Sequence, residues 1–225
     1  MSVWIASLVL ATAPRTIEFS GYKWQVKAGT SQMGPGPNWW SDDAKSVWVD
    51  AKGALHMTVR NINGRWHSTE VYLEKSLGYG TYRFEVASPA NAVPNNVVLG
   101  LFTWSNPDED NHREIDFEIS RWGDPKAANA QFVVQPYDRP GQMVRFEIDP
   151  ASPSVHEFVW KPGSVAFTCS RPDGRQFATW SLAGAMIPKS VDEAVHINLW
   201  QFEGKVPSTG KPVEVVIKRF HFKPL

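Results

Sequence analysis

Hydrophobic and polar side chains alternate in short runs along most of this chain, the pattern of β-strands with one buried face. These runs are Ser46–Val49, Ala54–Val59, Gly80–Val86, Val97–Trp104, Glu114–Ile119, Ala130–Gln135, Val155–Trp160, Ser164–Ser170, Gln176–Trp180, Val195–Trp200 and Val213–Phe222. Turn-forming pairs such as Asn63-Gly64 and Pro162-Gly163 separate them, and no segment has a long, capped helical pattern. The sequence therefore predicts an antiparallel all-β sandwich or barrel.

The length of the chain fits one large β-domain. It has 225 residues, of which 42% are hydrophobic, and it contains no internal repeat or Pro/Ser-rich linker. We expect a single domain over residues 16–225. Residues 1–15 carry a short apolar run that ends in Ala11, Thr12 and Ala13, as a secretory cleavage site would, but no Lys or Arg precedes it. This stretch is interpreted as a signal-peptide remnant, which predicts a secreted or periplasmic protein, or as an N-terminal strand.

Charge and cysteine content narrow the range of partners and cofactors. The 23 basic and 23 acidic side chains give a formal net charge of zero, so electrostatics offers no reason to expect nucleic acid or an anionic membrane as a partner. No apolar run approaches the roughly 20 residues of a membrane-spanning helix. Cys169, the single cysteine, cannot form an internal disulfide and is expected to be a small core residue. We expect a monomer.

One run differs from the others because its polar positions are all acidic. In Glu114–Ile119 the side chains of Glu114, Asp116 and Glu118 alternate with apolar ones, so a strand would place the three acids on one face. Like charges lined up on a sheet face weaken it. Two Glu side chains four residues apart on a strand, about 13 Å between Cα atoms, can lean together to the ~5–5.5 Å that retaining glycosidases use.

Crowding should also raise at least one pKa in this trio, so that one carboxyl stays protonated while another is ionised. That combination is what glycoside hydrolysis needs. Two other interpretations of the acidic face remain open: an exposed edge strand that happens to be acidic, or a cation site, although hard cations usually recruit acids from loops.

The residues around the acids resemble those of glycoside hydrolase family 16, whose members carry Glu-x-Asp-x-Glu on a concanavalin A-like jelly roll. The stretch Gly100–Gly123, GLFTWSNPDEDNHREIDFEISRWG, is similar to an aromatic strand, a polar loop and that motif in its uninterrupted form, as in lichenases and xyloglucan endotransglycosylases. Further similar segments follow the family's order: Ser68–Val86, Ala130–Val134, His156–Phe167 and Ile187–Trp200.

The resemblance implies a jelly-roll enzyme that cleaves β-glycosidic bonds in a polysaccharide or oligosaccharide by a retaining, endo-acting mechanism, as a hydrolase or a transglycosylase, with no cofactor or metal. By this resemblance Glu114 is the nucleophile, Glu118 the general acid and base, and Asp116 the residue that modulates the nucleophile. The side chains implied to contact sugar are Trp104, His112, Trp200, Glu70, Gln131 and Gln135.

Three positions depart from the family pattern. Ser20 and Val133 each stand where an Asn is expected, and Tyr72 stands where a sugar-contacting Arg is expected. The identity of the glycan therefore does not follow from the resemblance. The alternative function is a carbohydrate-binding, lectin-like protein on the same fold that has lost turnover, although a lectin does not need three closely spaced carboxyl groups.

Overall fold

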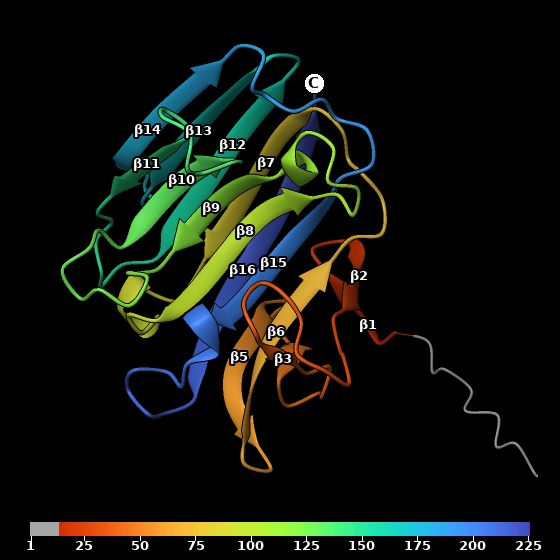
Figure 1. Ribbon diagram of the computed structural model, residues 1–225, viewed down its shortest axis with the longest axis vertical. Coiled ribbons are helices and arrows are strands. Elements are labelled where there is room, and N and C mark those ends of the chain that lie inside the picture. Colours follow the sequence, from red (N-terminus) through yellow and green to blue (C-terminus); the bar gives the residue numbers. More distant parts are fainter. Residues whose placement is uncertain (1–13) are drawn as a thin grey trace, which may run out of the picture.

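The structure is a computed structural model that describes residues 14–225. These residues form sixteen strands and three short 3-10 helices, and most of the strands are labelled in Figure 1. The strands are β1 (Thr16–Phe19), β2 (Tyr22–Val26), β3 (Trp39–Trp40), β4 (Val47–Val49), β5 (Leu55–Ile62), β6 (Arg65–Tyr72), β7 (Gly80–Val86), β8 (Val97–Trp104), β9 (Ile115–Ile119), β10 (Ala130–Val134), β11 (Met143–Phe146), β12 (Ser154–Lys161), β13 (Ser164–Ser170), β14 (Gln176–Ala183), β15 (Ala194–Gln201) and β16 (Val213–Pro224). The helices are η1 (Ala90–Ala92), η2 (Asn111–Arg113) and η3 (Phe202–Gly204).

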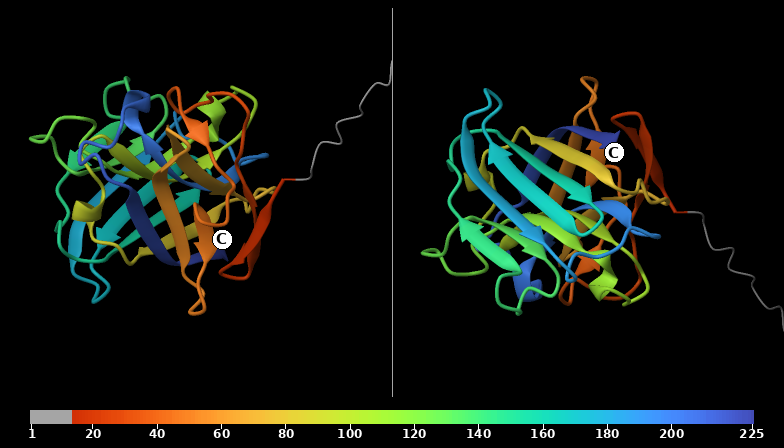
Figure 2. Two further views of the ribbon diagram at one scale, coloured as in Figure 1. Left: turned by 90° about the horizontal axis from the view of Figure 1, so that it is seen from below. Right: turned by 90° about the horizontal axis from the view of Figure 1, so that it is seen from above.

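The strands form two layers that face each other (Figure 2), antiparallel throughout except that the two-residue β3 pairs in parallel with β6. The first layer runs in the order β1-β2-β6-β15-β8-β9-β10-β11, and the second in the order β4-β5-β16-β7-β12-β13-β14. The β5–β6 hairpin belongs to both layers, because β6 pairs with β15 and β5 pairs with β16. The predicted antiparallel β-sandwich is confirmed.

The alternation seen in the sequence decides which face of each strand enters the core. On β9 the side chains of Ile115, Phe117 and Ile119 are at most 1% exposed and pack between the layers. Their neighbours on β8 and β10 follow the same parity, as shown by the buried Leu99 and Phe132. The remaining positions of these strands point away from the second layer, and the acidic side chains lie on that outer face.

Strand boundaries differ slightly from those predicted. Glu114 precedes the first residue of β9 and Gln135 follows the last residue of β10, each by one position. Five strands have no counterpart among the predicted runs: β1, β2, β3, β6 and β11. The turn between β1 and β2 consists of Ser20 and Gly21, both with positive φ, a conformation that usually has Asn or Asp rather than Ser at the first position.

Three further expectations concern the N-terminus, membrane-spanning segments and Cys169. The interpretation of residues 1–15 as a signal remnant or a strand falls almost entirely outside residues 14–225. Within that range, no helix has the length and apolar character needed to cross a bilayer. Cys169 is buried and unpaired, as expected for a core residue.

Replacing Phe117 by Ala should destabilise the fold, because this ring holds β9 from behind. It packs against Phe132, Phe146 and His156, with ring centroids 5.4, 6.1 and 3.7 Å away. We expect a loss of about 3–5 kcal/mol in the free energy of unfolding, measured by chemical denaturation. The exposed Val206 serves as control, and Val206→Ala should change stability by less than about 0.5 kcal/mol. Equal effects of the two substitutions would contradict this account of the core.

Candidate active site

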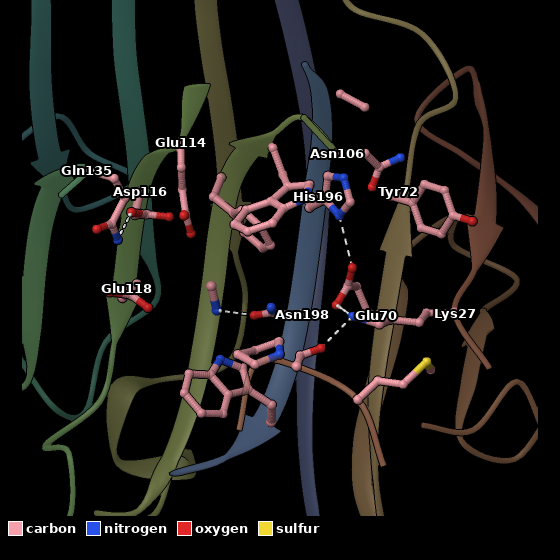
Figure 3. A pocket seen from close by; sticks show the side chains of 18 of the residues that line it. Lys27, Glu70, Tyr72, Asn106, Glu114, Asp116, Glu118, Gln135, His196 and Asn198 are labelled. Carbon is pink, nitrogen blue, oxygen red and sulfur yellow. Dashed lines mark hydrogen bonds and ion pairs between the residues drawn. The ribbon is translucent and has the colours of Figure 1, made fainter. Parts of the chain in front are cut away.

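A cleft of about 1400 Å³ lies on the outer face of the first layer (Figure 3). Its lining comes from β2, β6, β8, β9, β10, β11 and β15 and from the loops that follow several of these strands. The three acids of β9 stand on one side of the cleft, and a polar group around Glu70 and His196 stands on the other. A cavity of this size can hold several sugar units or a ligand of similar volume.

The acidic strand is regular along its whole length. Both of its neighbours pair with it without a register shift, so no bulge interrupts the alternation of side chains. Glu114, Asp116 and Glu118 therefore all reach the cleft, as the sequence predicted for one face of a strand. Asp116, in the middle, is 3% exposed.

Strand register places specific residues in a row across the cleft floor with Glu118. Its partner on β10 is Gln131, its partner on β8 is Gly100, and the row continues through Asn198 on β15 to Glu70 on β6. Gly100 has no side chain, and its N–H donates to Asn198 Oδ1 over 3.2 Å. A Cβ at this position would lie 2.5 Å from the same oxygen. Any side chain at position 100 would therefore collide with Asn198, whose amide oxygen covers the glycine on the cleft floor beside Glu118.

The next row contains Asp116. It is opposite Val133 on β10 and Phe102 on β8, and the row continues through His196 on β15 to Tyr72 on β6. Val133 is fully buried and offers no polar atom to a ligand. Tyr72 stacks on His196 with ring centroids 5.2 Å apart, so the position where an Arg was expected carries an aromatic contact instead.

Burial and mutual repulsion favour the protonated forms of the three acids. Burial is the main cause that raises the pKa of Glu114 to about 8, with contributions from the charges of Glu118 and Glu70, while a hydrogen bond with Asp116 acts in the opposite direction. Burial, followed by the charge of Asp116, raises the pKa of Glu118 to about 8. Burial and Glu114 raise the pKa of Asp116 well above its ordinary value. The three carboxyl groups titrate as a coupled set.

Two amide side chains orient these carboxyl groups. Gln131 Nε2 donates to Glu118 Oε2 at 2.5 Å, and Gln135 Nε2 donates to Asp116 Oδ2 at 3.2 Å. An oxygen that accepts from an amide is poorly placed to carry a proton, so the proton of Glu118 belongs on Oε1 and that of Asp116 on Oδ1. The shared hydrogen bond then runs from Asp116 to Glu114. Gln131 and Gln135 thus contact the acids directly.

Glu114 is held by an unusual backbone segment. The four residues before it, Asp110 to Arg113, all have φ between 51° and 60°, the left-handed region that non-glycine residues rarely adopt. The Arg113 guanidinium, 6% exposed, ties this turn to Glu109 at 3.2 Å and to Asp192 at 3.4 Å. Neither carboxylate belongs to the acidic trio, so Arg113 acts on the loop geometry and leaves the acids without a cation of their own.

The aromatic residues predicted to contact sugar occupy different environments. Trp104 lines the cleft at the end of β8. His112 lies behind it, outside the cleft lining, and stacks on its ring at 3.9 Å between centroids. Trp200 lines the cleft but is only 7% exposed, because Trp122 and Phe202 pack against it at 5.9 and 6.5 Å. The polar candidate Glu70 lines the cleft as well, and both its oxygens are already engaged by protein groups.

Several cleft residues were missed by the sequence analysis, namely Lys27, Phe102, Trp122, Arg145, His196 and Asn198. The two-residue period of a strand could have identified three of them. His196 and Asn198 share the strand face of Trp200, and Phe102 shares the strand face of Trp104. No sequence signal was available for Trp122, whose own backbone has a positive φ of 53° where its side chain enters the cleft.

Comparisons with known proteins support the fold. No protein-family model matches the chain, and no curated protein matches it either. Among solved structures, a β-glucanase of Bacillus licheniformis has a TM-score of 0.67 and 20% identity, with 96% of this chain and 100% of that chain covered. A family 16 glycoside hydrolase of Bacteroides ovatus, in complex with a G4G4G3G product, has a TM-score of 0.65, 14% identity and coverages of 89% and 94%.

A third similar structure is a Mycobacterium tuberculosis protein described as an immunostimulatory antigen and pseudo β-1,3-glucanase. It has a TM-score of 0.66 and 18% identity, with 89% of this chain and 91% of that chain covered. Together these structures define the class: the chain has the jelly-roll fold of the glycoside hydrolase family 16 glucanases. The fold expected from the sequence resemblance is confirmed.

The stability of the protein should fall as pH rises, because its buried carboxyls bind protons more tightly when folded. For Glu118 the stabilising contribution is complete below the ordinary pKa of 4.5 and is lost as pH rises through about 8. Glu118→Gln removes this loss. We expect the melting temperature of the variant to gain at least about 3 °C on the wild type between pH 5 and pH 8, measured by calorimetry. The exposed Glu18→Gln is the control and should follow the wild type; a parallel decline in both variants would count against burial as the cause.

Proposed function

We propose that this protein is a retaining, endo-acting glycoside hydrolase or transglycosylase that cleaves β-glycosidic bonds in a polysaccharide, with β-glucans as the first substrate class to test. The observation that carries the proposal is the coupled, buried acid trio of β9 on the open floor of a cleft of about 1400 Å³. Carboxyl groups with strongly raised pKa values in a cleft are typical of sites that transfer protons during a reaction.

In the first step Glu118 is the general acid. Its raised pKa keeps a proton on Oε1 at neutral pH, and that proton passes to the glycosidic oxygen as the bond to the anomeric carbon breaks. Glu114 attacks the same carbon and forms the covalent glycosyl-enzyme. Glu114 must be ionised to attack, and the hydrogen bond from Asp116 favours that form against burial, which raises the pKa of Glu114 to about 8. The reactive state is therefore the one in which the coupled set has lost a single proton, from Glu114, while Glu118 and Asp116 remain protonated.

In the second step Glu118, now ionised, removes a proton from the incoming acceptor. Water as the acceptor gives hydrolysis, and a sugar hydroxyl gives transglycosylation. The acceptor oxygen bonds to the anomeric carbon as Glu114 leaves, so the original configuration is restored. Glu114, Asp116 and Glu118 thus act as nucleophile, modulating residue and acid–base catalyst. We also propose that the protein acts as a monomer outside the cytoplasm, in line with the apolar run near its N-terminus.

A carbohydrate-binding protein without turnover is the second candidate, favoured by the likeness to the pseudo β-1,3-glucanase. A reducing-end assay on β-glucans, xyloglucan, agars and carrageenans separates the two. Product from any member of the panel supports the enzyme. Saturable binding of a glycan with no product from any of them supports the binding protein.

Removal of either catalytic Glu should abolish turnover and leave the fold intact. Glu114→Gln and Glu118→Gln keep the shape of the side chain but remove the nucleophile or the transferable proton, so we expect at least a 10³-fold loss in kcat, consistent with the sizes typical of such roles. Asp116→Asn should cost less, because Asp116 acts only through Glu114. A Glu118→Gln protein with most of its activity would show that the acid has been misassigned.

Activity should follow a bell-shaped curve in pH, because Glu114 must be ionised while Glu118 remains protonated. The Arg145 cation, which also lines the cleft, lowers the pKa of Glu118. We therefore expect Arg145→Gln to move the alkaline limb of the kcat/KM profile to higher pH. The matched control is the exposed Arg219→Gln on β16. A shift of the alkaline limb to lower pH in Arg145→Gln would contradict the assignment of that limb to Glu118.

A further inference from the structure

His196 is fixed in one orientation on the side of the cleft opposite the acids. Its imidazole lies between two aromatic rings, with centroid distances of 5.2 Å to Tyr72 and 5.1 Å to Phe102. These rings come from the neighbouring strands on either side, β6 and β8, so the imidazole cannot turn without displacing one of them. A side chain held this firmly in a cleft is preorganised for contact with a ligand.

The ion pair between Lys27 and Glu70 determines which nitrogen of the His196 imidazole carries a hydrogen. His196 Nδ1 contacts Glu70 Oε1 at 2.9 Å, and Lys27 Nζ contacts Glu70 Oε2 at 2.8 Å. Burial opposes ionisation of Glu70, yet the attraction and hydrogen bonds of His196 and Lys27 lower its pKa below the ordinary value. An ionised carboxylate only accepts hydrogen bonds, so Nδ1 must carry the hydrogen of this contact.

Lys27 is itself positioned with care. Besides Glu70, its ammonium group donates to the Gly34 carbonyl at 2.8 Å and lies 4.1 Å from the centroid of the Trp40 ring. Lys27 and His196 therefore each bind one oxygen of Glu70, so that both oxygens have a protein partner. Glu70, predicted to contact sugar, is therefore placed to act through His196 rather than by its own oxygens.

The second imidazole nitrogen faces the cleft. Within residues 14–225 the structure gives His196 Nε2 no hydrogen-bond partner, and it is not among the polar atoms that are sealed from solvent. His196 lies in the same row of the sheet as Asp116, with Phe102 between them. Gly100 is paired with Asn198, two residues from His196 on β15, so a sugar that extends from the acids across β8 toward β15 reaches the row that contains this nitrogen.

We propose that His196 is a specificity-determining residue that hydrogen-bonds a sugar hydroxyl through Nε2, and that Glu70 and Lys27 are the positioning residues that fix its imidazole. The ligand is a neutral sugar unit on the β15–β6 side of the acids, where the two aromatic rings also offer apolar contact. This inference rests on the proposed function. It explains how the site recognises a sugar although Tyr72 stands where the resemblance implied an Arg.

The state of the imidazole can be read without any turnover. Long-range ¹H–¹⁵N spectra of the protein labelled in its histidines report which ring nitrogens carry hydrogen, and His196→Phe assigns the signal. We expect a protonated Nδ1, and a shift of the Nε2 resonance when laminaritetraose or cellotetraose is added. An unprotonated Nδ1, or an Nε2 resonance unmoved by both sugars, would overturn the proposal.

Kinetics on the glycan that gives the most product then separate this inference from the proposed function. His196→Phe preserves an aromatic ring between Tyr72 and Phe102 but removes the nitrogen, so we expect kcat/KM to fall about 10- to 100-fold. His196→Gln, which can place an amide nitrogen near the position of Nε2, should recover part of that loss. His221→Gln, a change at an exposed histidine on β16, should stay within about twofold of the wild type.

The possible outcomes are distinct. A wild type that yields no product from any glycan contradicts the proposed function, while the spectra still decide the role of His196. An active wild type with an equally active His196→Phe overturns the inference alone. A loss in His196→Phe that His196→Gln does not recover at all would show that the ring matters for packing and not for a hydrogen bond, and would also overturn it.

Discussion

The burial of three carboxyl groups on one strand face is the constraint on which the rest of the site depends. Charged carboxylates at this spacing repel one another and lose hydration, so the folded protein keeps protons on the set. This is tolerable only if the strand cannot bend away from the strain. The regular pairing of β9 with β8 and β10, and the aromatic packing of Phe117 behind it, supply that rigidity.

The identity of the neighbouring groups is as important as the acids themselves. A cation in direct contact would ionise a carboxyl group and remove the proton that a general acid needs. The chain instead places the neutral donors Gln131 and Gln135 on the acids and directs Arg113 toward a surface loop. Within residues 14–225 the cations that line the cleft stand away from direct contact with the acids: Arg145 on one side and Lys27, bound to Glu70, on the other. Burial and mutual repulsion therefore keep the pKa values raised, because neutral amide donors lower them less than a cation in direct contact would.

How much of this was predictable depends on whether an element obeys the two-residue period. The acidic trio and the core face of β9 followed directly from alternation, and the same rule applied to β15 would have found His196. Alternation says nothing about residues held in left-handed turns. Trp122 and the segment that ends at Arg113 reach their places through positive φ values, which the sequence does not reveal for non-glycine residues. Lys27 lies beyond the end of its strand, where no pattern applies.

Core and cleft positions place different demands on the sequence, which explains why this chain shares its fold with glucanases of 14–20% identity. Core positions require only an apolar side chain of suitable volume, and many residues satisfy that requirement independently. Cleft positions are linked across strands: Tyr72 contacts His196, His196 contacts Phe102 and Glu70, and Glu70 contacts Lys27. The loss of His196 or Lys27 alone would leave an oxygen of the buried Glu70 without its partner, and the loss of Tyr72 or Phe102 would remove a ring that packs on His196. A new sugar preference on this fold should therefore involve concerted changes on β2, β6, β8 and β15, while β9 keeps its three acids.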